Sequence, residues 1–257
     1  MTNQFQQFKQ LHSGTEPLLI GNVWNVQSAK VFEHKQFKAI ATSSQAVAGT
    51  LGYADGQEMN LDEYLFIIRR IAASVSIPFS VDLESGYGDT PKQICDNIAR
   101  LHGLGVSGIN IEDSVVADGK RSIVPAEAFA IKLKQICKLL NAAKIGMFIN
   151  VRSDSFLLGL PNALEDALRR IDLYQKTGVH GLFFPCITRI EEIQQVAQHS
   201  NLPVNVMCMP HLPDFKQLRN AGVKRISMGP FLSDDIYKKL EASLEQIVAE
   251  GSFESLF

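Results

Sequence analysis

Short, continuous apolar runs alternate along the chain with longer segments that have helical spacing. Apolar runs of this kind are typical of strands in a parallel sheet, which are buried on both faces. Eight runs predict strands at residues 18–20, 39–41, 78–81, 108–111, 147–151, 182–184, 204–207 and 225–228. The segments between them predict helices at residues 27–35, 61–71, 90–103, 125–140, 161–178, 190–198, 213–220 and 234–250.

The repetition of strand and helix eight times predicts the fold class. Alternation of this kind is typical of an α/β protein with a parallel sheet, and eight repeats favour a closed (β/α)8 TIM barrel over an open, doubly wound sheet. No linker, low-complexity stretch or shift in composition divides the chain. We therefore expect one barrel domain over residues 1–257.

Composition and charge exclude several classes of protein. The 257 residues carry 25 Lys and Arg against 27 Asp and Glu, a net charge of −2, and the basic residues form no stripe. We therefore expect no nucleic-acid partner. No segment approaches the roughly 20 apolar residues that span a bilayer, and the start of the chain is polar. The four cysteines form no C-x-x-C pair, so we expect a reduced, cytoplasmic protein without a membrane partner.

Acidic residues follow two neighbouring predicted strands. Asp82 and Glu84 come after the third strand, Glu112 after the fourth, and Arg152 after the fifth. The site of a (β/α)8 barrel lies at the carboxyl ends of its strands. Carboxylates crowded there would repel one another without a cation, and Mg²⁺ takes carboxylate oxygens while leaving positions for an oxyanionic substrate. With Arg152, this set predicts a site that holds a carboxylate and stabilises an enolate beside it.

Polar residues near the strand ends can also have a purely structural role. A carboxylate at a strand end is often a helix cap, and Asp89 fits that role before Pro91. Residues 86–88 lack the Lys-Ser/Thr of a phosphate loop. His180 and His211 have no ligand-spaced partners and are interpreted as packed or solvated side chains. The concentration of carboxylates on neighbouring strands nevertheless favours the functional interpretation for that set.

Four segments of the chain, in order, resemble the isocitrate lyase/phosphoenolpyruvate mutase superfamily. They are residues 41–58, Val81-Asp82-Leu83-Glu84-Ser85-Gly86-Tyr87-Gly88, Ile111-Glu112-Asp113 and Asn150-Val151-Arg152. The acidic element ending in Gly-Tyr-Gly, followed by the Glu-Asp pair, is the most specific part. The resemblance implies an (α/β)8 barrel that binds Mg²⁺, or Mn²⁺ as the alternative metal, together with a 2-oxo or 2-hydroxy carboxylate.

The resemblance also implies a metal set. Asp82 looks like the direct metal ligand, and Asp55, Glu84 and Glu112 look like the residues that hold metal-bound water.

The resemblance also implies which residues contact the substrate. The resemblance places Ser43, Ser44, Gln45 and Arg152 on the substrate and, by a looser match, Asn25. We expect Lys120 or Arg121 to close over the substrate from a mobile loop, and Tyr87 and a metal-bound water are the candidate proton donors.

The loop at residues 113–122 separates the branches of the superfamily. The lyases for isocitrate and 2-methylisocitrate carry a catalytic cysteine in this loop, and here the loop has none, so those two activities are not expected. The mutase branch has a lysine with a nearby Asn-Ser, of which only Lys120 and Ser122 remain. Residues 119–122 look closer to the basic loop of oxaloacetate decarboxylase-like members, although a solvated basic turn explains them equally well.

We therefore expect a Mg²⁺-dependent C–C lyase or decarboxylase that acts on a small 2-oxo carboxylate through a metal-stabilised enolate. Phosphonopyruvate or phosphoenolpyruvate mutase or hydrolase chemistry, which breaks a P–C bond, is the alternative from the same fold. An alternative of another class is a non-catalytic barrel that binds a 2-oxo acid or dicarboxylate.

The last predicted helix, residues 234–250, has an apolar face formed by Ile236, Leu240, Leu244 and Ile247. Members of the superfamily exchange their last helix between subunits, so the resemblance implies a homodimer or homotetramer in which this face packs on a partner. In the alternative, the helix closes its own barrel.

Overall fold

The strands of the computed structural model, which describes residues 4–56 and 58–257, form a nearly closed parallel barrel. The first predicted strand is split at Ile20 into β1 (Leu18–Leu19) and β2 (Gly21–Val23). β1 pairs with β11 at one end of the sheet and β2 pairs with β3 at the other, so the sheet returns to the same stretch of chain. The remaining barrel strands are β3 (Ile40–Thr42), β4 (Phe79–Asp82), β5 (Gly108–Glu112), β8 (Phe148–Arg152), β9 (Gly181–Phe183), β10 (Val204–Met207) and β11 (Arg225–Ser227). The prediction of a barrel is confirmed.

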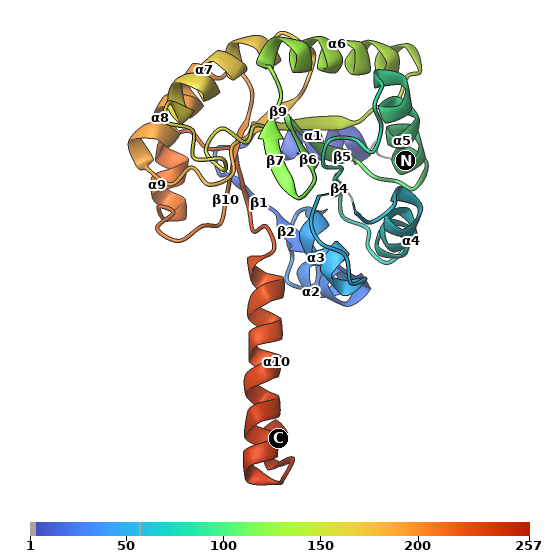
Figure 1. The fold of residues 1–257 in the computed structure, drawn as a ribbon, viewed down its shortest axis with the longest axis vertical. Helices are drawn as coiled ribbons and strands as arrows, with labels where there is room; N and C mark the ends of the chain where they lie inside the picture. Colours follow the sequence, from blue (N-terminus) through green and yellow to red (C-terminus); the bar gives the residue numbers. More distant parts are fainter. Residues whose placement is uncertain (1–3, 57) are drawn as a thin grey trace.

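Helices cover the outside of the barrel (Figure 1). All eight predicted helices are present, with ends shifted by a few residues: α2 (Val26–His34), α4 (Leu61–Ala72), α5 (Pro91–Gly103), α6 (Ala126–Ala142), α7 (Ala163–Tyr174), α8 (Ile190–His199), α9 (Phe215–Asn220) and α10 (Phe231–Glu250). The start of α5 follows from its sequence, because Thr90 and Gln93 form a capping box around Pro91 at the first helical position. The core between helices and strands is one apolar cluster that contains the helix faces predicted from spacing, such as Leu65, Ile68 and Ile71 of α4.

Besides the short 3₁₀ helix η1 (Glu254–Leu256), three elements of the described chain were not predicted. Two are helices, α1 (Gln4–Leu11) and α3 (Ser44–Thr50). Phe8 of α1 is fully buried against Leu18, Ala39 and Phe148, which lie at the amino-terminal ends of their strands, so α1 closes that end of the barrel. The third element is an antiparallel hairpin of β6 (Ser114–Ala117) and β7 (Lys120–Ile123).

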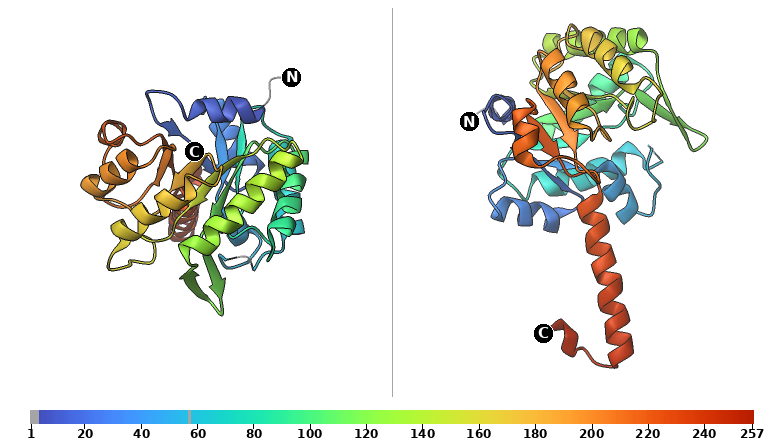
Figure 2. Two further views of the ribbon diagram at one scale, coloured as in Figure 1. Left: turned by 90° about the horizontal axis from the view of Figure 1, so that it is seen from above. Right: turned by 90° about the vertical axis from the view of Figure 1, so that its left-hand side faces the viewer.

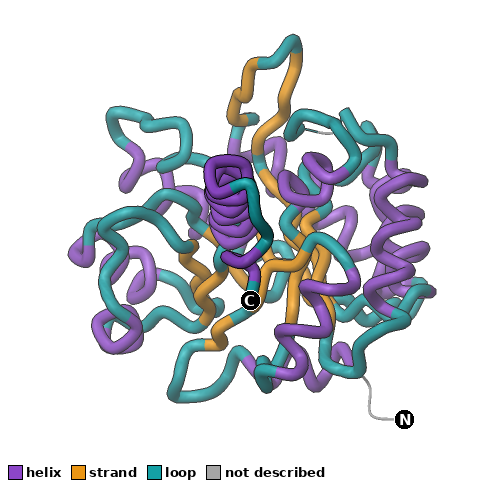
Figure 3. Tube along the Cα trace, turned by 90° about the horizontal axis from the view of Figure 1, so that it is seen from below, coloured by secondary structure: helices purple, strands orange, loops and turns teal. Residues whose placement is uncertain are grey.

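The hairpin replaces the expected loop after β5. Its turn is Asp118-Gly119, with φ values of 50° and 70°, the conformation of a two-residue turn that matches the twist of the flanking strands. The hairpin extends from the rim of the barrel at the carboxyl ends of the strands, and it is the green ribbon that projects in Figure 2 and the orange one that projects in Figure 3.

Helix α10 runs away from the barrel instead of packing on it (Figures 1 and 2). Ile236, Leu240 and Leu244 are 44%, 51% and 52% exposed, and Ser233 is the only buried residue of the helix. The alternative in which this helix closes its own barrel is therefore wrong. None of the helices in the part of the chain that the structure describes has the length and apolar content needed to cross a membrane.

Candidate active site

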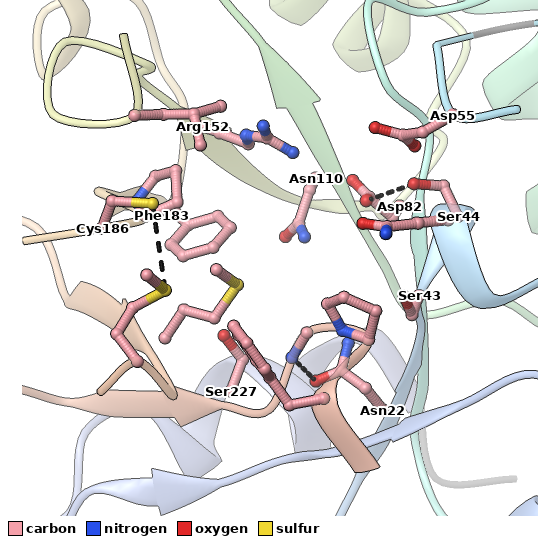
Figure 4. Close-up of a pocket in the computed structure, with 18 of the residues that line it drawn as sticks. Asn22, Ser43, Ser44, Asp55, Asp82, Asn110, Arg152, Phe183, Cys186 and Ser227 are labelled. Atoms are coloured by element: carbon pink, nitrogen blue, oxygen red, sulfur yellow. Dashed lines mark hydrogen bonds between the residues drawn. The ribbon is translucent and has the colours of Figure 1, made fainter. Parts of the chain in front are cut away.

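A cavity of about 500 Å³ lies at the carboxyl ends of the barrel strands (Figure 4). The polar and charged side chains of its lining come from β2 to β8 and the segments after them, with Ser227 of β11: Asn22, Ser43, Ser44, Gln45, Asp55, Asp82, Asn110, Arg121 and Arg152. The other lining residues are Leu157, Leu158, Phe183, Pro185, Cys186, Met207, Met209, Gly229, Pro230 and Phe231.

Asp82, the last residue of β4, is held by groups of the neighbouring strand and helix. Its backbone N–H donates to Thr42 Oγ1 at 2.9 Å, and Tyr64 donates its hydroxyl to the Asp82 carbonyl at 3.0 Å. Ser44 donates its hydroxyl to Asp82 Oδ2 at 2.9 Å. The other carboxylate oxygen, Oδ1, is buried and has no hydrogen-bond partner among the described residues. Burial raises the pKa of Asp82, while the charge of Arg152 opposes that shift.

Ser44 reaches Asp82 because Ser43 fixes the start of α3. The Ser43 side chain accepts a hydrogen bond from the backbone N–H of Ala46 at 3.3 Å and so caps the helix. Gln45 follows in the first turn of the helix and also lines the cavity. The three predicted substrate contacts therefore lie together at the cavity, beside Asp82.

Glu84 is a buried carboxylate next to Asp82. It is 4% exposed and sits at a positive φ of 51°, so the backbone turns sharply after β4. Burial, with added repulsion from Asp82 and Asp55, raises the pKa of Glu84 to about 8. Tyr87 donates its hydroxyl to Glu84 Oε1 at 3.0 Å. Tyr87 lines a separate surface hollow beside α4 and is not among the residues that line the cavity.

Two arginines share the carboxylates on this side of the site. Arg152, at the end of β8, pairs through Nε with Asp154 Oδ1 at 2.6 Å and through Nη1 with Glu112 Oε2 at 3.1 Å. Arg121, on β7 of the hairpin, pairs with Glu112, with Asp154 at 3.2 Å and with Asp55 at 3.2 Å. Burial raises the pKa of Glu112 to about 7 although both arginines oppose the shift. The hairpin is thereby tied to the loop that carries Asp55.

The carboxylates outnumber the cations that neutralise them. Asp55, Asp82, Glu84, Glu112 and Asp154 interact with one another. Three described arginines interact with members of this set: Arg121 and Arg152 by ion pairs, and Arg225, from inside the barrel, with Asp82. This excess of negative charge and the unpaired Oδ1 of Asp82 fit a hard divalent cation that prefers oxygen ligands. Within the described chain, no three His, Cys, Asp or Glu side chains converge closely enough to bind a metal directly. Mg²⁺ is usually bound through one or two carboxylates and keeps several water ligands, and the unpaired oxygen of Asp82 suits such a cation.

Five of the predicted site residues are not among those that line the cavity: Glu84, Tyr87, Glu112, Asn25 and Lys120. Glu112 pairs with both lining arginines and Glu84 interacts with Asp82, so these two carboxylates lie beside the lining. Asn25 caps α2, accepting a hydrogen bond from the Ser28 backbone N–H at 2.8 Å, and Lys120 is exposed on the hairpin. Their near neighbours Asn22 and Arg121 line the cavity instead. Of the two basic residues considered for closing over the substrate, the structure places Arg121 at the site.

Sequence analysis also missed the asparagines inside the barrel. Asn22 donates to the Thr42 carbonyl at 3.0 Å and accepts from the Met228 N–H at 2.8 Å, so it joins β2 to its neighbours. Asn110 Oδ1 accepts from Asn150 at 2.9 Å. Each is a polar residue within an otherwise apolar strand, and this pattern could have identified both. An amide side chain is rarely buried unless hydrogen bonds satisfy it.

Fold and site together define a (β/α)8-barrel protein with an acidic, arginine-bearing site at the carboxyl ends of its strands. The family model described as phosphoenolpyruvate phosphomutase matches residues 8–248, and the chain belongs to this family. The predicted kinship with the isocitrate lyase/phosphoenolpyruvate mutase superfamily is thus confirmed.

The chain is similar to relatives that are named for different activities. An uncharacterised protein of Mycobacterium tuberculosis (strain H37Rv) is 30% identical over 224 residues, which cover 86% of this chain and 81% of the relative. An oxaloacetate decarboxylase of Bradyrhizobium sp. (strain BTAi1) is 27% identical over 77% of this chain and 69% of its own. The crystal structure of a phosphonomutase-like protein of Burkholderia cenocepacia J2315 superposes with a TM-score of 0.89 at 32% identity, over 95% of this chain and 100% of that one.

Proposed function

We propose that this protein is a Mg²⁺-dependent C–C lyase or decarboxylase that acts on a small 2-oxo or 2-hydroxy carboxylate through an enolate. The observation that carries the proposal is the buried, unpartnered Oδ1 of Asp82 within a group of carboxylates that two arginines only partly neutralise. Relatives named oxaloacetate decarboxylase and 2-methylisocitrate lyase support the reaction class.

In this proposal the side chains of the site have separate roles. Asp82 would hold Mg²⁺ directly, with Asp55, Glu84 and Glu112 acting through water, and the bound metal supplies positive charge for the oxygen of the developing enolate. Ser43, Ser44 and Gln45 at one side and Arg152 at the other orient the substrate carboxylate. Arg121 holds the hairpin against the Asp55 loop, which limits the access of water to the enolate.

A metal held by Asp82 would lower the pKa of the water around it, and such water would supply the proton in this proposal. Tyr87 was the other candidate, but its hydroxyl donates to Glu84 and it does not line the cavity. We therefore give Tyr87 a positioning role, in which it orients the Glu84 carboxylate.

Phosphonate chemistry is the second candidate. It is favoured by the family model, described as phosphoenolpyruvate phosphomutase, and by the kinship to the phosphonomutase-like protein of Burkholderia cenocepacia. The hairpin turn Asp118-Gly119-Lys120-Arg121-Ser122 lacks the asparagine that this branch carries, which places C–C chemistry first.

The test is direct observation of products. Purified protein with Mg²⁺ is incubated with oxaloacetate, phosphonopyruvate and 2-methylisocitrate, and reactions are followed by proton and phosphorus NMR. Metal-dependent loss of a C–C bond supports the first proposal, and a new phosphorus resonance supports the second. Tight binding of a 2-oxo acid by calorimetry without turnover contradicts both and favours a non-catalytic binding protein.

We also propose that the protein is a homodimer or homotetramer in which the apolar face of α10 packs on a second copy. The face is long and exposed, which is costly for an isolated chain in water. Light scattering at micromolar concentration tests this. Leu240→Asp should shift the mass toward the monomer, whereas the adjacent control Glu241→Asp should not, and a monomeric wild type contradicts the proposal.

A further inference from the structure

The cavity is chemically divided between the two halves of the barrel. In Figure 4, Asp55, Asp82 and Ser44 gather on one side, and Phe183 and Cys186 lie on the other. The apolar side is built from the last residues of β9 and β10 and from the segments after β8, β9 and β10, and we call these residues the apolar wall: Leu157, Leu158, Phe183, Pro185, Met207 and Met209. It contains no Lys, Arg or His.

The cations of the cavity lining, Arg121 and Arg152, both direct their guanidinium groups to carboxylates of the acidic side, although Arg152 itself borders Phe183. Arg152 pairs with Glu112 and Asp154, and Arg121 pairs with Glu112, Asp154 and Asp55. A carboxylate placed against the apolar wall would lose its hydration without gaining a charged partner. Burying an ionised group in this way is strongly unfavourable, whereas burying a hydrocarbon group there is favourable.

Packing fixes the apolar wall in place. Phe183 is 5% exposed at the end of β9. Gly229 has a φ of 60° and lies so close to Met207 that a Cβ atom there would be 2.7 Å from its sulfur. Cys186, at a φ of 64°, directs its sulfur to within 3.9 Å of the Met209 sulfur. Because these side chains support one another, the wall presents a defined apolar surface to the cavity.

We propose that the substrate carries a hydrocarbon group, not a second carboxylate, on the end that faces the apolar wall. This inference rests on the proposed function, which places the 2-oxo carboxylate end at Asp82 and Arg152. It narrows the substrate class to 2-oxo monocarboxylates that carry a hydroxyl at C4 and an alkyl group beyond it. In such a substrate the C3–C4 bond breaks, its electron pair stays on C3 as the enolate of the 2-oxo acid, the C4 hydroxyl loses its proton to water, and an alkyl aldehyde leaves. This favours a C–C lyase over a decarboxylase, which needs a second carboxylate as its leaving group.

Matched pairs of 2-oxo acids test the inference by binding alone. Calorimetry on the Mg²⁺-loaded protein compares 2-oxopentanoate with 2-oxoglutarate, and 2-oxohexanoate with 2-oxoadipate. Each pair differs by a terminal methyl against a terminal carboxylate. We expect the methyl member to bind about tenfold tighter or more in both pairs, because only the carboxylate must be desolvated without a partner. Equal or tighter binding of the dicarboxylates overturns the inference.

A variant of the wall provides the converse experiment. Met209→Lys adds a cation to the apolar wall and should remove the preference or reverse it, while Met209→Leu should keep it. A preference that is unchanged in Met209→Lys overturns the assignment of this side to the tail.

Oxalate, which has the head group and no tail, separates the two proposals. If oxalate binds but the dicarboxylate binds as tightly as the methyl member or more tightly in both pairs, only this inference fails. If neither oxalate nor any 2-oxo acid binds with Mg²⁺ present, the proposed function itself fails.

Discussion

The two halves of the barrel rim stabilise the site in opposite ways. The half from β3 to β8, with the hairpin, gathers five carboxylates and two arginines, and it leaves Asp82 Oδ1 unpaired. The half from β9 to β11 presents packed apolar side chains whose positions are satisfied without any ligand. Both halves lie on strands of the same kind, buried on both faces.

The difference teaches which side depends on a ligand. Burial, with added repulsion between neighbouring carboxylates, raises the pKa of Glu84. The charged acidic half is therefore unfavourable for the fold until it binds a cation. The apolar wall has no such requirement. We therefore expect changes in the acidic half to act on metal binding and turnover, and changes in the wall to act on the choice of substrate.

The largest effect is expected from Asp82→Asn. The variant keeps the shape of the side chain but removes the charge of the proposed direct ligand, so Mg²⁺-dependent turnover should fall by about 10³-fold. Steady-state kinetics and Mg²⁺ titration by calorimetry measure this loss. Asp89→Asn, an exposed position in the same segment, is the control and should retain activity. Full turnover by Asp82→Asn would contradict the assignment of the metal site to the acidic half.

Arg121→Met and Lys120→Met are neighbours with very different expected effects. Arg121 ties the hairpin to Asp55 and Glu112, whereas Lys120 is exposed. We expect Arg121→Met to lower kcat/KM by about 10²-fold, because it removes one of the two arginines that pair with the buried carboxylates Glu112 and Asp154 and frees the hairpin from Asp55. Lys120→Met should change kcat/KM by less than about threefold. Equal losses in the two variants would contradict the assignment of Arg121 as the cation that covers the site.

Ser44→Ala should have an intermediate effect. Its hydroxyl orients Asp82 through Oδ2, and loss of such a partner typically lowers metal affinity by about 10-fold to 100-fold. Calorimetry should therefore report weaker Mg²⁺ binding, while saturating Mg²⁺ restores most of kcat. Ser44→Cys, of similar size, indicates whether volume alone matters. An unchanged Mg²⁺ affinity in Ser44→Ala would show that the hydroxyl does not position the ligand.

Glu84→Gln sharpens the electrostatic side of the comparison in metal-free protein. The pKa of Glu84 is raised from 4.5 to about 8 in the folded state, so its proton stabilises the fold at low pH and that contribution is lost as pH rises toward 8. The glutamine has no proton to lose. Its free energy of unfolding should therefore exceed that of wild type by an amount that grows with pH, by more than about 1 kcal/mol at pH 8.

Denaturant unfolding at pH 5, 7 and 9 in the presence of a chelator measures this difference. Saturating Mg²⁺ is the control, because it should stabilise wild type more than Glu84→Gln. A difference that does not change with pH would mean that Glu84 is not under strain in the acidic half.

The sequence was sufficient for the barrel because its strands are apolar throughout. Eight runs such as residues 147–151 marked their positions, and capping signals such as Thr90-Pro91 placed the helix starts. Helix α1 was missed because Gln4–Leu11 is rich in glutamine, and its few apolar residues gain their meaning only from the barrel end that they cover. The hairpin did carry a signal, since Asp118-Gly119 between extended segments favours a tight turn.

The sequence predicted the part of the site in which charged residues are concentrated. It did not predict the part that depends on how side chains are placed in three dimensions. Carboxylates after adjacent strands identified the acidic half, but the choice between Lys120 and Arg121 depends on the register of the β6–β7 hairpin, which turns alternate residues to opposite sides. The apolar wall could not be found, because Met207 and Phe183 read as ordinary core residues until the barrel places them at the rim.

The smallest effect is expected from Leu158→Ala in the apolar wall. Leu158 is half-buried at the cavity, and its backbone N–H donates to the Asp154 carbonyl at 2.9 Å, a bond that truncation of the side chain leaves in place. Its truncation removes part of the surface proposed to hold the substrate tail, so affinity for 2-oxopentanoate should fall by about fivefold while affinity for oxalate stays the same. Calorimetry with both ligands gives the answer, and Leu158→Met is the control of similar volume. Parallel losses for oxalate and 2-oxopentanoate would mean that the two halves of the rim do not act independently, because a change in the wall would then have reached the metal side.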